Sequence, residues 1–239
     1  DGSTSDTIYE YDPSADTIST QSATLPAVRE RATSAAVGGR VYHLGGRDGS
    51  GNNVDTIYEY DPSADTISTQ SATLPTAVRD ATAAAVNAKV YHFGGNDGST
   101  SDTIYEYDPS ADTISTQSVT LPAARQSATS AAVNGQVYHF GGQNSNFNPT
   151  DTIYEYDPSA DSISTQSATL PAALQRATSA VVNGKIYHLG GFNSNNIVVD
   201  TIYEYDPSAD SISTQSATLP TALYQATSAV VDGNVYVLG

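Results

Sequence analysis

Four histidines occupy the same place in four copies of a repeated segment. They are His43, His92, His139 and His188, and the fifth copy has Val237 there. Imidazole is the commonest metal ligand in proteins, so a recurring histidine first suggests a metal site. One histidine per repeat, however, would place these side chains far apart, and Val237 shows that an apolar residue also serves. We therefore expect histidines packed between repeats with one ring nitrogen hydrogen-bonded, and neither a metal nor another cofactor.

A glutamate also recurs unchanged, at Glu10, Glu59, Glu106, Glu155 and Glu204. Two carboxylates about 5–10 Å apart can perform acid and base catalysis in glycosidases. Five symmetric glutamates on strands favour a structural role instead, each bonded to a neighbouring strand or turn. The chain has no cysteine, which excludes a thiol nucleophile. Because an active site must break the repeat symmetry and no asymmetric catalytic cluster is seen, we expect no catalytic residues and no enzyme activity.

The copies differ most just after a repeated Leu-Pro pair. The polar side chains of this stretch are the candidate ligand-binding residues: Arg29, Arg31, Arg79, Arg125, Gln126, Gln175, Arg176 and Tyr224. Different polar groups on one repeated frame would form an asymmetric binding site. Arginine there would favour a carboxylate or another acidic group. The alternative interpretation is drift at solvent-exposed positions.

A second variable region follows each repeated Gly-Gly pair. It comprises residues 47–54, 96–101, 143–150 and 192–199. These loops are rich in Asn, Ser and Gly, and they contain the isolated apolar residues Phe147, Phe192 and Ile197. Asparagine with a few aromatic rings could bind sugars, but we favour the interpretation of tolerant surface loops. The aspartates near these loops are not spaced like a known calcium loop.

The elements that position these residues form a strict repeat. The phrase Asp-Thr-Ile-Tyr-Glu-Tyr-Asp-Pro begins at Asp6, Asp55, Asp102, Asp151 and Asp200, in steps of 49, 47, 49 and 49 residues. A fixed period in this range predicts a solenoid or a propeller. In the second copy, β-forming segments alternate with turn residues, so four short strands are expected at residues 55–60, 66–70, 81–86 and 89–93.

The turn before the last of these strands is a strong hairpin signal in four copies. Its residue pairs are Gly38-Gly39, Asn134-Gly135, Asn183-Gly184 and Asp232-Gly233. The second copy has Asn87-Ala88 instead. An alanine with positive φ costs about 1 kcal/mol relative to glycine, so we expect a strained or altered turn at this position.

These signals together resemble the kelch repeat. The matching residues of the first copy are Arg29, residues 35–37, Gly38-Gly39, Val41-Tyr42, Gly45-Gly46, Tyr60-Asp61-Pro62 and Leu74-Pro75. The family's tryptophan is replaced by Ile18, Ile67, Ile114, Ile163 and Ile212, which can still fill a pocket between blades. The resemblance implies an all-β propeller with four antiparallel strands per blade. It also implies that the stretch after Leu-Pro enters the innermost strand near the mouth of the central channel.

The two ends of the chain match the interior of the repeat. Residues 1–6 repeat residues 97–102, and Gly239 corresponds to Gly94. We therefore expect one domain, residues 1–239, that forms a five-bladed propeller from repeats of about 47–49 residues. The N-terminal strands would pair with the C-terminal strands, and the closing blade would be shared between roughly residues 227–239 and 1–26.

The net charge of −17 makes a nucleic-acid partner unfavourable, because such a field repels phosphates. No apolar run approaches the length of about 20 residues that inserts into a membrane. The excess of Asp resembles proteins from high-salt environments, or it reflects a turn residue repeated five times. The compartment is not determined by the sequence.

We interpret the chain as a monomeric, non-enzymatic binding scaffold for a protein or glycan ligand at the variable rim of the channel. Two alternatives remain open at this point. The near identity of the copies also fits an engineered or recently amplified repeat protein with no evolved ligand. A carbohydrate-active hydrolase or lyase that works in the channel is the other alternative.

Overall fold

The computed structural model describes residues 5–12, 14–15 and 17–239, and within them all regular structure is β-strand. Four sheets contain four consecutive strands of the repeat each. The first consists of β3 (Thr33–Val37), β4 (Arg40–Leu44), β5 (Thr56–Asp61) and β6 (Thr66–Thr73). The second consists of β7 (Thr82–Val86), β8 (Lys89–Phe93), β9 (Ile104–Asp108) and β10 (Thr113–Thr116). The predicted four strands per period are therefore confirmed.

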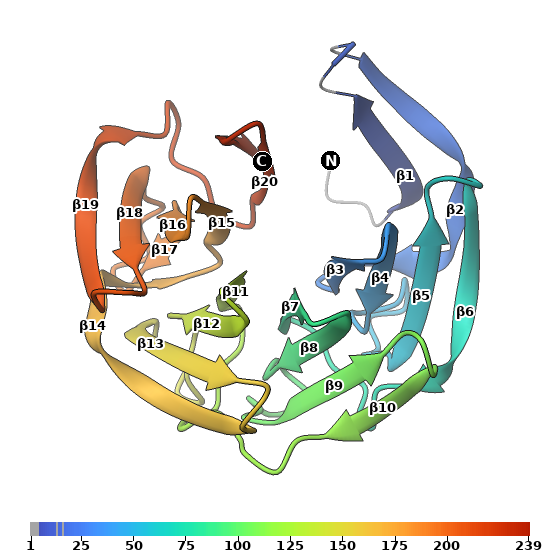
Figure 1. The fold of residues 1–239 in the computed structure, drawn as a ribbon, viewed down its shortest axis with the longest axis horizontal. Coiled ribbons are helices and arrows are strands. Elements are labelled where there is room, and N and C mark those ends of the chain that lie inside the picture. Colours follow the sequence, from blue (N-terminus) through green and yellow to red (C-terminus); the bar gives the residue numbers. More distant parts are fainter. Residues whose placement is uncertain (1–4, 13, 16) are drawn as a thin grey trace.

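The third and fourth sheets repeat this order with small additions. The third consists of β11 (Thr129–Val133), β12 (Gln136–Phe140), β13 (Thr150–Asp157) and β14 (Ser162–Gln175), with the short β17 (Phe192–Asn193) at its edge. The fourth consists of β15 (Thr178–Val182), β16 (Lys185–Leu189), β18 (Thr201–Asp206) and β19 (Ser211–Thr218). The sheets stand like blades around a centre, with β3, β7, β11 and β15 innermost (Figure 1).

The ends of the chain form two separate hairpins. These are β1 (Ser5–Asp12) with β2 (Thr17–Arg29), and β20 (Thr227–Val231) with β21 (Asn234–Leu238). They lie on either side of a gap between the chain ends (Figure 1). The described residues thus form four complete blades rather than the five we expected, and the predicted pairing of N-terminal with C-terminal strands is not made among them. In the four blades a covalent loop joins the second and third strands. Pairing of the N-terminal with the C-terminal strands has no such loop, so it must overcome the entropic cost of bringing the two chain ends together.

The core lies between neighbouring blades. Tyr42 of the first blade meets Tyr107 of the second edge to face, with ring centroids 5.5 Å apart. Tyr107 and Val90 are almost fully buried, because they insert into the apolar face of the preceding blade. The predicted filling of the tryptophan position by isoleucine is confirmed for Ile114, which packs against the same cluster. Burial on both faces explains why the repeated strands are apolar on both sides.

The turn at Asn87-Ala88 has the predicted strain. Both residues are left-handed, with φ of 51° and 61°. Gly184, at the place of Ala88 in another blade, has φ of 77°. Ala88 therefore keeps the hairpin geometry that glycine adopts without steric cost elsewhere.

Candidate functional site

Five residues with left-handed backbones lie where the chain enters each innermost strand. We call them the rim ring, and they are Arg31, Asp80, Ser127, Arg176 and Gln225, with φ of 55°, 55°, 54°, 56° and 56°. Each residue after Arg31 donates its backbone N–H to the carbonyl of the preceding member, at 2.9, 2.7, 2.8 and 2.7 Å in chain order. The backbone of the rim ring is thus fixed from blade to blade, while its five side chains are of four different types.

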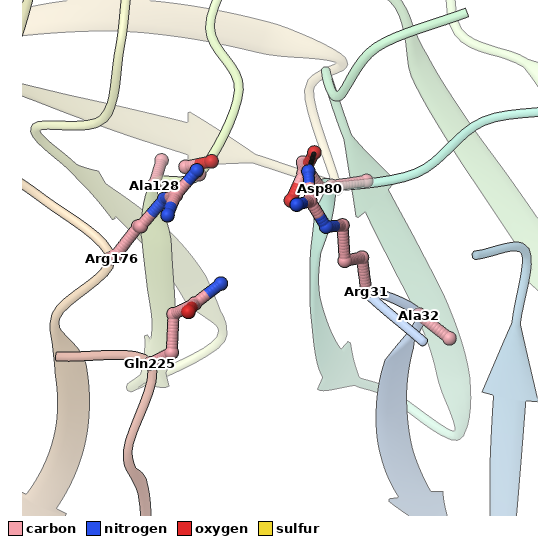
Figure 2. Close-up of a pocket in the computed structure, with 8 residues that line it drawn as sticks. Arg31, Ala32, Asp80, Ala128, Arg176 and Gln225 are labelled. Atoms are coloured by element: carbon pink, nitrogen blue, oxygen red, sulfur yellow. Dashed lines mark hydrogen bonds and ion pairs between the residues drawn. The ribbon is translucent and has the colours of Figure 1, made fainter. Parts of the chain in front are cut away.

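These side chains surround a cavity of about 320 Å³. Arg31 and Asp80 face Arg176 and Gln225 across it (Figure 2). The Asp80 carboxylate lies 3.3 Å from the guanidinium of Arg31 and 3.4 Å from that of Arg79, so one carboxylate serves two cations. Arg176, by contrast, forms no ion pair with a carboxylate in the described part of the chain. The unbalanced positive charge of the cavity is therefore concentrated near Arg176.

An adjoining cavity of about 250 Å³ extends from the rim ring toward the loop after Gly-Gly of the third blade. A row of amides lies along it: Asn96 Nδ2 donates to Gln126 Oε1 at 2.8 Å, and Gln126 Nε2 donates to Gln143 Oε1 at 3.0 Å. Gln143 Nε2 in turn donates to the carbonyl of Phe147 at 2.8 Å. The Phe147 ring lines the same cavity and is 65% exposed. Fixed amides and an exposed aromatic residue thus line one cavity.

Two of the predicted site residues lie behind the rim. Arg125 is 5% exposed and donates to the hydroxyl oxygens of Thr152 and Tyr154, both at 2.9 Å. Its guanidinium also stacks over the Tyr154 ring at 5.4 Å. Burial lowers the pKa of the Arg125 guanidinium from its usual value. Arg29 makes the equivalent contacts with Thr56 and Tyr58. Arg29 thus joins the end of β2 to β5, and Arg125 joins the segment before β11 to β13. Neither arginine lines either cavity.

The other predicted residues lie closer to the cavities. Arg31 and Arg176 line both of them, and Arg79 and Gln126 line the second. Gln175 is buried, with an Oε1 that accepts no bond from the described residues. Tyr224 is 45% exposed and its ring lies 5.8 Å from that of Phe192. The structure therefore brings four predicted residues together and places the remaining ones around or behind them.

Sequence reasoning missed several residues that line these cavities. They are Asp80, Asn96, Ser127, Gln143 and Gln225. Asp80, Ser127 and Gln225 belong to the same variable segments as the predicted arginines, so the variation between copies was the signal for them. Asn96 and Gln143 follow the Gly-Gly pairs, and Phe147 was an isolated aromatic residue in a polar loop.

Two Ser–His pairs invite comparison with a nucleophile and its base. Ser34 Oγ lies 2.8 Å from His43 Nδ1, and Ser130 Oγ lies 3.1 Å from His139 Nδ1. Burial lowers the pKa of His43 to about 4 and that of His139 to about 3, so both rings are weak bases at neutral pH. The Nε2 atoms of both rings have no partner among the described residues, so no carboxylate there orients them as a catalytic triad requires. The pairs thus have the geometry of packing contacts.

Within residues 5–12, 14–15 and 17–239, no three His, Asp or Glu side chains gather closely enough to hold a metal ion. The same residues include no helix that could cross a membrane. The recurring histidines instead pack between blades, as in the contact between Phe93 and His139 at 5.9 Å.

Two family models match the chain. The one described as the KLHDC2/KLHL20/DRC7 Kelch-repeats domain matches residues 66–239. The one described as the Kelch motif matches residues 29–66. A comparison with curated proteins gave no match. Propellers of this kind are generally binding scaffolds, and they commonly bind proteins.

Proposed function

Because this chain belongs to the kelch-repeat family, we propose that it is a non-enzymatic binding scaffold whose ligand, a protein or a glycan, is held at the rim ring. The observation that carries this proposal is the contrast between backbone and side chains. Four inter-blade hydrogen bonds fix the backbone of the ring, and its five side chains are of four different types. A rigid frame that carries unlike polar groups is the usual construction of a specific binding site.

The residues that contact the ligand in this proposal are Arg31, Arg79, Gln126 and Arg176. Tyr224 extends the same surface toward the last blade, whereas Gln175 is buried, and Arg29 and Arg125 support the strands behind the surface. Guanidinium groups in this arrangement favour a ligand with a carboxylate or another acidic group. The net charge of −17 opposes a nucleic-acid ligand.

We further propose that the molecule closes into a five-bladed, monomeric ring of one domain, with a last blade shared between residues 227–239 and 1–26. In the second blade, Tyr105 and Tyr107 are 7% and 1% exposed because they fill the face of the first. Their counterparts Tyr9 and Tyr11 are 65% and 44% exposed.

The place that these tyrosines would fill is open in the structure. A cavity of about 570 Å³ lies against the last complete blade and the hairpin β20–β21. Its apolar lining includes Leu219, Leu223, Val235 and Val237. Leu219 and Leu223 are the counterparts of Leu74 and Val78, which pack with Tyr105 and Tyr107 in the complete interface. Closure would also bring Gln225 beside Arg31 and complete the rim ring.

A glycan and peptide array tests the proposed site. The wild type is compared with the double variant Arg31→Ala/Arg176→Ala and with Arg40→Gln as a control. Arg40 pairs with Glu59 and Asp61 at the far end of its strand from the Gly-Gly pair. We expect binding to a small set of probes by the wild type and the control, and its loss in the double variant. The proposal is contradicted if no probe binds, or if a bound glycan is cleaved.

A further inference from the structure

We propose that the cavity beside Phe147 binds a sugar ring that carries a carboxylate, so that the ligand of the rim is an acidic glycan. The inference rests on the proposed function, because it assigns a ligand class to the same site. It begins from Phe147, whose backbone and exposure are both unfavourable for a phenylalanine.

Phe147 has a left-handed backbone, with φ of 63°. In the loops of two other blades, the residue at the equivalent turn position is Gly51, with φ of 84°, or Asn196, with φ of 59°. The equivalence is shown by the same bond in each turn, since Gly51, Phe147 and Asn196 donate their N–H to the carbonyl of the residue three positions earlier. Glycine and asparagine tolerate this conformation, and a bulky aromatic residue does not.

Phe147 is therefore held in a strained conformation with its ring 65% exposed. Neither feature helps folding. Residues with strained backbones cluster at functional sites. Phe147 lines the cavity of about 250 Å³. An aromatic face beside a cavity can bind the apolar C–H face of a sugar ring, just as aromatic rings pack on other apolar groups.

The row of amides in the same cavity supplies what the polar edge of a sugar needs. Each amide NH₂ of Gln126 and Gln143 has two N–H groups, and the row of amides uses one of each. The free donors and the second lone pairs of the carbonyls can bond hydroxyl groups, which are donors and acceptors at once. Because the amides hold one another in place, little side-chain entropy is lost when the ligand binds.

Arg176 supplies the preference for an acid. It lines the same cavity, and it forms no ion pair with a carboxylate of the described residues. Arg31 and Arg79, in contrast, already share the Asp80 carboxylate. A planar carboxylate on a sugar ring can form the paired hydrogen bonds that a guanidinium favours. The cavity therefore offers an apolar face, a row of amides and one available cation to a single ring.

Calorimetry with trimers of galacturonate, glucuronate and mannuronate tests the inference. The comparison ligands are the methyl ester of each trimer, which lacks the charge, and triglutamate, which has carboxylates without a sugar ring. We expect at least one uronate trimer to bind the wild type and its methyl ester to bind at least tenfold more weakly. Triglutamate should bind at least tenfold more weakly than that trimer.

Three variants test whether the sugar ring binds beside Phe147. Phe147→Gly should weaken binding of the uronate trimer by at least tenfold. It should also raise the midpoint of thermal unfolding, because glycine relieves the backbone strain. Phe147→Tyr keeps an aromatic face and should stay within threefold of the wild type. Asn196→Gly is the matched control, since it changes the equivalent turn residue in a loop outside the cavity, and it should leave binding unchanged.

The outcomes separate this inference from the proposed function. Failure of all three uronates to bind overturns the inference, as does equal binding by the wild type and Phe147→Gly. If a peptide or a neutral glycan from the array binds and the Arg31→Ala/Arg176→Ala variant loses it, the acidic-glycan assignment is wrong but the rim remains the binding site.

Discussion

The carboxylate of Asp112 in the second blade accepts the backbone N–H of Ser71 in the first, at 2.8 Å. It also accepts the N–H of Ala72 at 3.3 Å and the hydroxyl of Tyr107 at 3.1 Å. The same arrangement recurs where Asp65 accepts from Ser22 and where Asp210 accepts from Ser167. A repeated aspartate at the end of the Asp-Pro turn thus joins each blade to the preceding one.

Replacing this carboxylate should loosen one blade interface. Asp112→Ala is expected to lower the free energy of unfolding by about 1–3 kcal/mol, since it leaves polar groups without a charged acceptor. Asp102→Ala, in the same repeat, is the control and should change the free energy of unfolding by less than about 0.5 kcal/mol. Urea denaturation measures both, and equal effects would contradict the assigned role of Asp112.

The buried histidines make stability depend on pH. Burial lowers the pKa of His92 to about 4, whereas an unfolded histidine takes up a proton near pH 6.5. The unfolded chain therefore binds more protons between about pH 6.5 and 4, so stability falls as the pH is lowered through this window. The slope is at most about 1.4 kcal/mol per pH unit for each such histidine.

His92→Val tests this prediction with a residue that the fifth copy already uses at Val237. Urea denaturation at several pH values between 7 and 4 should give a shallower decline for the variant than for the wild type. Parallel declines would show that His92 does not contribute. Below this window Asp112 adds a second decline: burial alone would raise its pKa, but the N–H bonds from Ser71 and Ala72 lower it overall.

The left-handed turn at Ala88 predicts a stabilising substitution. Ala88→Gly should raise the free energy of unfolding by about 1 kcal/mol, because glycine adopts a φ of 61° without steric cost. Gly184→Ala is the reverse experiment, and a Cβ there would meet no atom within 4 Å, so only the backbone conformation is tested. It should destabilise by about the same amount. Changes of the same sign in both variants would contradict this explanation.

What the repeat encodes five times could be predicted from sequence, because each signal is local. The alternation of β-forming segments with turn residues predicted the four strands of each repeat. The strained turn at Ala88 was predictable because a hairpin with a two-residue loop requires positive φ at that position. The resemblance to kelch repeats was confirmed on the same grounds, since it rests on spaced local signals.

The roles of Arg29 and Arg31 show why the site was harder to predict. Arg29 points into its blade and bonds Tyr58, whereas Arg31, two residues later, lies on the rim. Arg31 has a left-handed backbone, and its carbonyl accepts the N–H of Asp80 from the next blade. That bond links residues 49 positions apart and has no local sequence signal.

Ring closure predicts one disulfide. Tyr42 pairs with Glu59 in the first blade, so Tyr236 should pair with Glu10 in the closing blade. Cα atoms paired across antiparallel strands lie about 4.5–5.5 Å apart, which a disulfide can span. The chain has no cysteine, so Glu10→Cys/Tyr236→Cys can form only the designed bond. Under mild oxidation of a dilute sample we expect cross-linked monomers.

The control for closure is Glu10→Cys/Asn234→Cys, which moves one cysteine two residues out of register. It should cross-link more slowly, as judged by non-reducing electrophoresis and by mass. Disulfide-linked dimers from the in-register pair would show that β1 pairs with another copy of the chain. Equal rates for the two pairs would contradict the proposed register.

The central claim, that the rim ring is the binding site, depends most on Arg176. The direct measurement is the dissociation constant of the strongest array ligand for the wild type, Arg176→Gln and the Arg40→Gln control. Loss of a charged hydrogen bond costs about 1.5–3 kcal/mol, so Arg176→Gln should weaken binding by at least about tenfold. Arg40→Gln should stay within about twofold. Equal affinities for the wild type and Arg176→Gln would contradict the claim.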